Sequence, residues 1–231
     1  MHRGERASLP RPVLMLVTDS TRRPARAHEG EEWLDDVVRE AVLGGVNIVQ
    51  LREKHLPTVD LIKLGLHVRD VIADRALLVV NGDLEATRML RADAIHLPSN
   101  GPTIRAVRAE LGDSTLISRA VHSAEEAVRA QDEGADFIVL GTVFETASKP
   151  GVRPIGLDAV CEVCARVRIP VIAIGGIDAS NAAAVLRAGA AGIAVIGAVM
   201  DAHDPRAAAS ELRTAIDGVR VHNTPAAGAG A

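Results

Sequence analysis

Aromatic side chains are scarce in this chain of 231 residues, which contains two Phe, one Trp and no Tyr. Proteins that bind single-stranded nucleic acid stack bases on aromatic rings, so this composition argues against such a platform. The formal net charge is −4 and the chain has no long basic block. Neither a nucleic-acid footprint nor an anionic-membrane footprint is therefore indicated. We expect no nucleic acid and no membrane among the partners.

Long apolar runs and cysteines are scarce as well. No apolar run reaches the ~18 residues of a membrane-spanning helix, and the charged start of the chain precedes no apolar signal core. We therefore expect a cytoplasmic protein. The only cysteines, Cys161 and Cys164, lie in a helical pattern without a second pair or clustered histidines, so we interpret them as ordinary thiols.

Strand-like and helical patterns alternate along the chain. The strand-like runs span residues 13–18, 46–51, 77–81, 94–97, 116–121, 137–141, 171–175 and 192–197. The helical patterns span residues 31–43, 59–73, 84–90, 104–111, 124–134, 157–167, 179–188 and 205–219. Several of the strand-like runs are apolar throughout, which is typical of parallel strands that are buried on both faces.

Eight βα units in a chain of this length predict an α/β protein with a (β/α)8 TIM barrel as its single domain, over residues 11–219. A doubly wound sheet is the alternative, but the chain lacks an early G-x-G-x-x-G turn. Residues 1–10 are predicted to form a flexible N-terminal arm. Residues 220–231, rich in Ala and Gly, are predicted to form a disordered tail.

The carboxyl ends of the strands carry the active site in TIM barrels. His122 follows the fifth strand-like run and precedes a capped helical pattern, which places a titratable imidazole at that end. The loop after the sixth run carries Thr146, Ser148 and Lys149. An imidazole beside hydroxyls and an ammonium indicates proton transfer on an anionic substrate.

The second, third and fourth runs also end in polar residues. Side chains alternate in direction along a strand, so Gln50, Arg52 and Lys54 should point the same way. Taken alone, this segment would be better explained as a strand end held by salt bridges. Asn81 ends the third run, where a simple turn is the alternative. His96 ends the fourth run, and we expect it to be a hydrogen-bonded core histidine rather than a catalyst.

Glycines follow the seventh and eighth runs at matching places. Gly175 and Gly176 follow the seventh, while Ile196 and Gly197 close the eighth. Glycine lets backbone N–H groups approach an anion, and many barrels bind phosphate between these two loops. We therefore predict that the backbone of these four residues binds a phosphate.

Three segments together resemble one family of thiamin-biosynthesis barrels, which comprises thiamin phosphate synthase and the TenI-type thiazole tautomerase. The segments read Gln-Leu-Arg-Glu-Lys at 50–54, Ala-Ile-Gly-Gly-Ile at 173–177 and Gly-Ile-Ala-Val-Ile at 192–196. The resemblance runs from Leu14 to about Ala202. It implies the barrel fold and a phosphorylated thiazole as the small-molecule substrate, but it fits both activities.

Departures from the synthase pattern favour the tautomerase. By the resemblance, Gly82 and Gly101 occupy the positions at which synthases carry aspartates that bind magnesium. Asp83 could partly substitute for these aspartates. His122 resembles the acid/base residue of the tautomerase. The resemblance then implies an isomerase that aromatises a thiazole carboxylate phosphate by a histidine-mediated proton shift and needs no metal or other cofactor.

The same resemblance assigns roles to the remaining site residues. Arg52 and Lys149 would hold the carboxylate, with Thr146 and Ser148 as hydrogen-bond donors. The alternatives are a thiamin phosphate synthase, a transferase that would use Mg²⁺, and a barrel that binds thiazole phosphate without catalysis. The sequence leaves open whether the chain forms a homo-oligomer.

Overall fold

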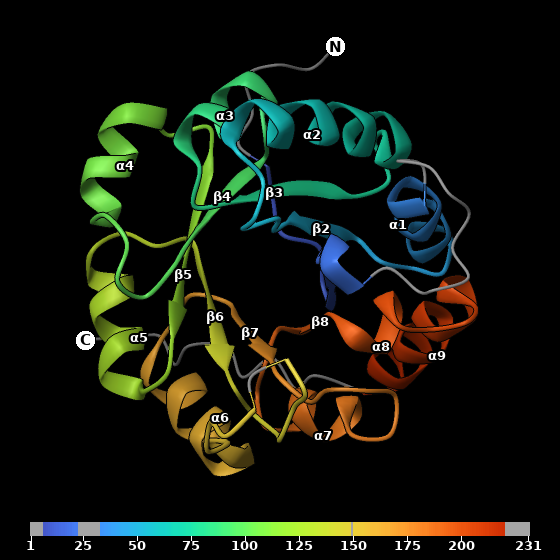
Figure 1. Ribbon diagram of the computed structural model, residues 1–231. Helices are drawn as coiled ribbons and strands as arrows, with labels where there is room; N and C mark the ends of the chain where they lie inside the picture. The colour runs from blue at the N-terminus through green and yellow to red at the C-terminus, as the bar shows by residue number, and fades with distance from the viewer. Residues whose placement is uncertain (1–6, 23–32, 149, 220–231) are drawn as a thin grey trace.

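Eight parallel strands form a closed barrel in the computed structural model, which describes residues 7–22, 33–148 and 150–219. Each strand pairs with the next along the chain, and β8 returns to pair with β1. The helices lie in a ring outside the strands (Figure 1). The predicted single-domain TIM barrel is confirmed.

The strands are short and follow one another at regular intervals. They are β1 (Val13–Val17), β2 (Ile48–Leu51), β3 (Leu77–Asn81), β4 (Ala94–Leu97), β5 (Leu116–Val121), β6 (Phe137–Gly141), β7 (Val171–Ile174) and β8 (Gly192–Val195). The helices are α1 (Trp33–Leu43), α2 (Thr58–Ile72), α3 (Leu84–Met89), α4 (Ile104–Leu111), α5 (Ala124–Asp132), α6 (Gly156–Arg166), α7 (Ala182–Arg187), α8 (Gly197–Met200) and α9 (Pro205–Asp217). A 3-10 turn, Ser20–Arg22, follows β1.

Alternation along each strand separates two apolar cores. In β1, Val13, Met15 and Val17 belong to the cluster that fills the barrel interior, whereas Leu14 and Leu16 belong to the larger cluster beneath the helices. Both sets are buried because the sheet is covered on both faces. The continuous apolar runs of the sequence have this cause.

Side-chain caps begin several of the helices that follow the strand ends. Ser123 accepts a hydrogen bond from the backbone N–H of Glu126 and so begins α5 directly after His122. Asp83 caps α3 and Thr103 caps α4 in the same way. The short cap sequences keep polar residues close to the carboxyl ends of their strands.

Two of the differences between the predicted and the observed bounds lie beside the glycine loops. The seventh helix begins at Ala182 rather than 179, because Asp178, Ser180 and Asn181 form a side-chain-bonded turn before it. The eighth strand ends at Val195, and the residues from Gly197 on form the short helix α8.

Both predicted chain ends lie largely outside the described residues. Residues 1–6 and 220–231 are not described, so the boundaries of the arm and the tail stay predictions. Ala7 and Leu9 pack against the interior cluster of the barrel. Within the described part of the chain, no helix combines the length and the apolar character that crossing a bilayer requires.

Gly192 is the position at which closure of the barrel tolerates no side chain. A Cβ atom there would lie 2.4 Å from both the Cβ atom and the carbonyl oxygen of Val13 on β1. We expect Gly192→Ala to lower the free energy of unfolding by about 1–3 kcal/mol, the usual cost of overpacking. Urea denaturation followed by circular dichroism measures the change.

Gly218→Ala is the matched control. Gly218 has a helical φ of −66°, and a Cβ there would lie no closer than 3.5 Å to another atom. Its substitution should leave stability unchanged or raise it by about 0.4–1 kcal/mol through the unfolded chain. Equal effects of the two substitutions would contradict the role of Gly192 in closure.

Candidate active site

A pocket of about 710 Å³ opens at the carboxyl ends of the strands. Every predicted site residue that the structure describes lines this one pocket: Gln50, Arg52, Lys54, Asn81, His122, Thr146, Ser148, Gly175, Gly176, Ile196 and Gly197. Lys149 lies outside the described residues. The volume suits small organic ligands, whose sites usually measure about 300–1,000 Å³.

The end of β2 separates its polar residues by alternation. Gln50 is 2% exposed and its Nε2 lies 3.4 Å from Oδ1 of Asn81 on β3. Arg52 and Lys54 follow on the same side and line the pocket. Glu53 points the other way and accepts hydrogen bonds from the backbone N–H and the hydroxyl of Ser20, at 2.8 and 2.6 Å. The predicted common direction of the three residues is confirmed.

His122 lies at the mouth, as its position after β5 predicted. Its backbone N–H donates to Oε2 of Glu126 at 2.7 Å, and its Nδ1 contacts the carbonyl oxygen of Gly141 on β6. A carbonyl oxygen only accepts hydrogen bonds, so Nδ1 is the donor in this contact.

His96 forms part of the pocket floor and is 8% exposed. Its Nδ1 lies 2.8 Å from the hydroxyl of Ser118 on β5. Burial, followed by the charges of Arg119 and Arg52, lowers the pKa of His96 to about 3. The prediction of a hydrogen-bonded core histidine is confirmed, and its imidazole is neutral near pH 7.

The two glycine loops differ in how closely other atoms approach them. A Cβ on Gly176, where φ is +63°, would lie 2.3 Å from the carbonyl oxygen of Glu145. A Cβ on Gly175 would lie 2.5 Å from Cγ2 of Thr142. Both glycines therefore let the loop after β7 pack on the loop after β6. A Cβ on Gly197 would meet only the tips of flexible side chains, those of Asp201 and Arg22.

The loop between β4 and α4 is fixed from behind by a buried guanidinium. Arg119 is 8% exposed, points away from the barrel interior and donates to the carbonyl oxygens of Pro98 and Pro102, the first at 2.8 Å. Burial lowers the pKa of Arg119 from its usual value, and the nearby carboxylate of Glu133 opposes that shift. Ser99 and Asn100, on the same loop, line the pocket.

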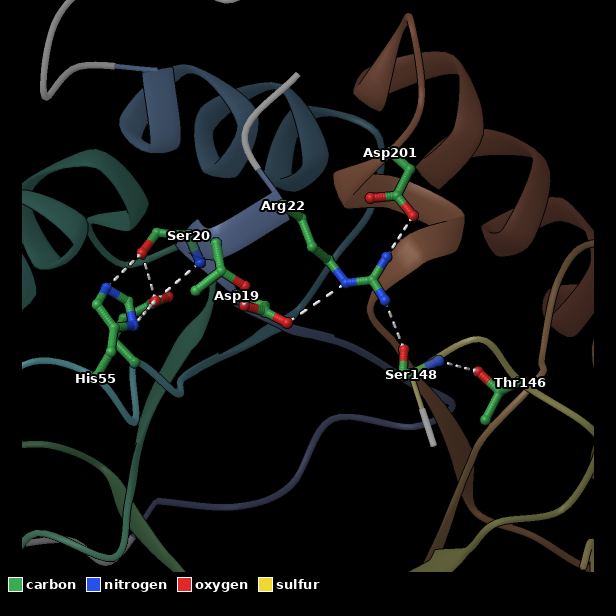
Figure 2. A network of polar contacts seen from close by, with 9 residues as sticks. Asp19, Ser20, Arg22, His55, Thr146, Ser148 and Asp201 are labelled. Atoms are coloured by element: carbon green, nitrogen blue, oxygen red, sulfur yellow. Dashed lines mark hydrogen bonds and ion pairs between the residues drawn. The ribbon is translucent and has the colours of Figure 1, made fainter. Parts of the chain in front are cut away.

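The sequence analysis missed one charged group of the pocket, the guanidinium of Arg22 on the 3-10 turn after β1. Figure 2 shows the guanidinium of Arg22 between Asp201 and Ser148, with Asp19 beside it. All four residues line the pocket. Asp19 follows β1 almost immediately, so the strand-end criterion that found His122 could have found this turn too.

The chain is similar in sequence to a family described as thiamine monophosphate synthase, whose profile matches residues 14–199. The chain belongs to this family. It is 38% identical over 206 residues to the thiamine-phosphate synthase of Roseiflexus sp. (strain RS-1), with 88% of this chain and 85% of the relative covered. It is 40% identical over 205 residues to that of Methanoculleus marisnigri, with 88% and 94% covered.

A solved structure is similar to the chain in both fold and sequence. The thiamine phosphate pyrophosphorylase from Pyrococcus furiosus superposes with a TM-score of 0.78 at 35% identity. The similarity covers 89% of this chain and 95% of that one. Fold and sequence therefore agree over most of the barrel.

The prediction of a thiazole tautomerase, and with it of an isomerase, is wrong. The relatives that match most of the chain are named thiamine-phosphate synthase, which is a transferase. The prediction depended on single residues in strand-end loops, Gly82, Gly101 and His122. Such loops vary among members of one family, while the barrel that the relatives share does not.

The buried imidazole of His96 makes stability depend on pH. Above its ordinary pKa of 6.5 the imidazole is neutral in the folded and unfolded states alike. Below that pH the unfolded chain takes up a proton that the folded protein refuses down to about pH 3. We therefore expect the free energy of unfolding to fall by about 1.4 kcal/mol per pH unit below pH 6.5 on account of this residue.

Urea denaturation at several pH values between 7 and 5 tests this expectation. His96→Asn should lose stability at pH 7, because packing and the Ser118 contact change, but its stability should decline less steeply toward pH 5. His203→Asn, on the exposed surface, controls for the loss of an imidazole. Parallel pH profiles for wild type and His96→Asn would contradict a neutral buried His96.

Proposed function

We propose that the chain is a thiamine-phosphate synthase, which joins hydroxymethylpyrimidine pyrophosphate to thiazole phosphate. One observation carries the proposal: the side chains of Gln50, Arg52 and Lys54 at the end of β2, the hydroxyls of Thr146 and Ser148 and the two glycine loops, which resemble the synthases, all line one pocket. The similarity to named synthases over 88% of the chain supports it.

The reaction is a substitution at the methylene carbon of the pyrimidine. The thiazole nitrogen attacks this carbon, a C–N bond forms, and the C–O bond breaks as pyrophosphate leaves with the electron pair. No proton changes place in this exchange. The protein therefore contributes orientation of the two rings and stabilisation of the negative charge that grows on the leaving group.

Two cationic side chains of the pocket are suited to binding a leaving pyrophosphate. Arg52 and Lys54 follow β2 on the pocket side, and guanidinium and ammonium groups form the stronger, charge-assisted hydrogen bonds with phosphate oxygens. Gln50 and Asn81 beside them offer amide groups for the polar edge of a pyrimidine. The backbone near Gly176 and Gly197 is assigned to the phosphate of the thiazole.

The resemblance to synthases also implies a magnesium ion beside the pyrophosphate. The residues present do not fit that ion at the expected place, because Gly82 and Gly101 have no side-chain oxygen. Both carboxylate oxygens of Asp83 are already bonded, to the backbone N–H of Ala86 and to the hydroxyl of Thr58, at 2.8 and 2.7 Å. Among the described residues, no three His, Cys, Asp or Glu side chains cluster as metal ligands. We assign charge neutralisation at this end of the pocket to Arg52 and Lys54.

A synthase assay with purified protein tests the proposal. Hydroxymethylpyrimidine pyrophosphate and thiazole phosphate should yield thiamine phosphate and pyrophosphate in equal amounts, quantified by chromatography. Arg52→Gln should lower turnover by about 10²-fold or more, the scale for loss of one charge-stabilising group. His122→Gln should change it by less than about threefold, because general acid–base catalysis has no proton to move.

Arg88→Gln is the control for loss of an arginine, since Arg88 pairs with Glu110 on the outer surface at 2.7 Å. Rates with Mg²⁺ and with excess chelator measure what a metal bound to pyrophosphate adds. Binding of both substrates without any product would contradict the synthase and favour a barrel that only binds thiazole phosphate. Turnover that collapses in His122→Gln would also contradict the proposed chemistry.

A further inference from the structure

Arg22 connects three loops of the pocket mouth. It lies on the 3-10 turn after β1. Its Nη1 lies 2.5 Å from Oδ2 of Asp201, which follows α8, and its Nη2 donates to the hydroxyl of Ser148, in the loop after β6, at 2.9 Å. Figure 2 shows this guanidinium between Asp201 and Ser148.

The guanidinium lies beside the loop to which the phosphate is assigned. A Cβ atom built on Gly197 would be 3.2 Å from Nη1 of Arg22 and 2.7 Å from Oδ2 of Asp201. Arg22, Asp201 and Gly197 also line the same pocket as Gly175 and Gly176. A ligand phosphate held near Gly197 is therefore within reach of the guanidinium by a side-chain movement alone.

The charges of this cluster do not suit a phosphate as they stand. Asp201 and Asp19 both lie beside Arg22, the latter with an oxygen 3.4 Å from its Nε. Two carboxylates around one guanidinium leave the cluster net negative, which would repel a dianionic ligand. An exchange of partners, in which the guanidinium turns from Asp201 to the phosphate, removes this conflict.

Breaking the ion pair between Arg22 and Asp201 requires little free energy. The side chain of Asp201 is 49% exposed, so its carboxylate regains water when Arg22 leaves, and exposed ion pairs contribute little to stability. Nε of Arg22 is buried and makes no hydrogen bond to the described residues, its contact with Asp19 being an ion pair at 3.4 Å, so the group has donor capacity left. Its planar fork of donors matches phosphate oxygens two at a time.

We propose that Arg22 binds the phosphate of the thiazole substrate, and that Asp201 is the internal anion that holds Arg22 when no phosphate is bound. This inference rests on the phosphorylated thiazole of the function proposed above. It adds a phosphate-binding residue on the β1 loop, outside the two glycine loops. It also assigns to Asp201 the role of a competitor of the ligand.

A double-mutant cycle with isothermal titration calorimetry on the full chain tests the proposal. The probes are thiazole phosphate and the corresponding thiazole alcohol. Arg22→Gln should weaken thiazole phosphate by about 10–100-fold, the worth of hydrogen bonds to a charged group, and leave the alcohol unchanged. Asp201→Asn should strengthen thiazole phosphate, because the competitor loses its charge. The double variant should remain as weak as Arg22→Gln.

The double variant separates two explanations. If Arg22 only neutralised Asp201, removing both charges would restore wild-type affinity, and that result would overturn the proposal. Equal weakening of phosphate and alcohol would overturn it too, since it would indicate a distorted pocket. Circular dichroism confirms that each variant is folded, and Arg88→Gln controls for the loss of a surface arginine.

Failure of the synthase and failure of this inference give different results. A wild type that binds thiazole phosphate but forms no thiamine phosphate contradicts the synthase, while the cycle still decides the role of Arg22. A wild type that binds phosphate and alcohol equally well overturns the inference, whatever its turnover.

Discussion

Pairing of β8 with β1 closes the sheet, and the position of every site residue depends on that closure. Val13 faces Gly192 in the register of this pair, at a separation that leaves no room for a Cβ atom. Once the ring is closed, side chains alternate between the interior and the helix layer on every strand. The carboxyl ends then converge on one mouth, and loops that are far apart in the sequence come to share a pocket.

Side chains that point into the barrel and side chains that point toward the helix layer have different roles at the pocket. Inward residues such as Gln50 and His96 form its floor and are nearly inaccessible to water. Side chains of the opposite alternation point outward, and Glu53, just after β2, attaches the loop after β1 by accepting hydrogen bonds from Ser20. The chemistry of the mouth is therefore carried by loop residues, while the strands supply fixed, largely neutral support.

Sequence patterns predicted the elements whose periodicity is local. The bounds of β3, β4, β5 and β6 agree with the apolar runs, because burial on both faces leaves a continuous signal. The start of α7 was displaced because a turn built by Asp178 and its neighbours replaced the first helical residues. Such a turn depends on side-chain hydrogen bonds that hydrophobic periodicity does not encode.

The sequence predicted the site residues that directly follow a strand. It did not predict the residues that are brought together by a contact between distant parts of the chain. His122 and Arg52 could be placed from their distance to a strand. Arg22 and Asp201 are 179 residues apart, and nothing in either local sequence indicates their pairing. The choice between isomerase and transferase failed for a related reason: it depended on a few loop residues, and fold alone does not decide an activity.

The contacts of Arg119 affect which positions of this barrel tolerate substitution during evolution. Its guanidinium donates to the carbonyl groups of Pro98 and Pro102, so the loop that carries the pocket residues Ser99 and Asn100 is attached to β5. The exposed face of α4, including Arg105 and Ala106, makes no part of that attachment. Substitutions can accumulate on this helix surface without altering the shape of the ligand pocket beside it.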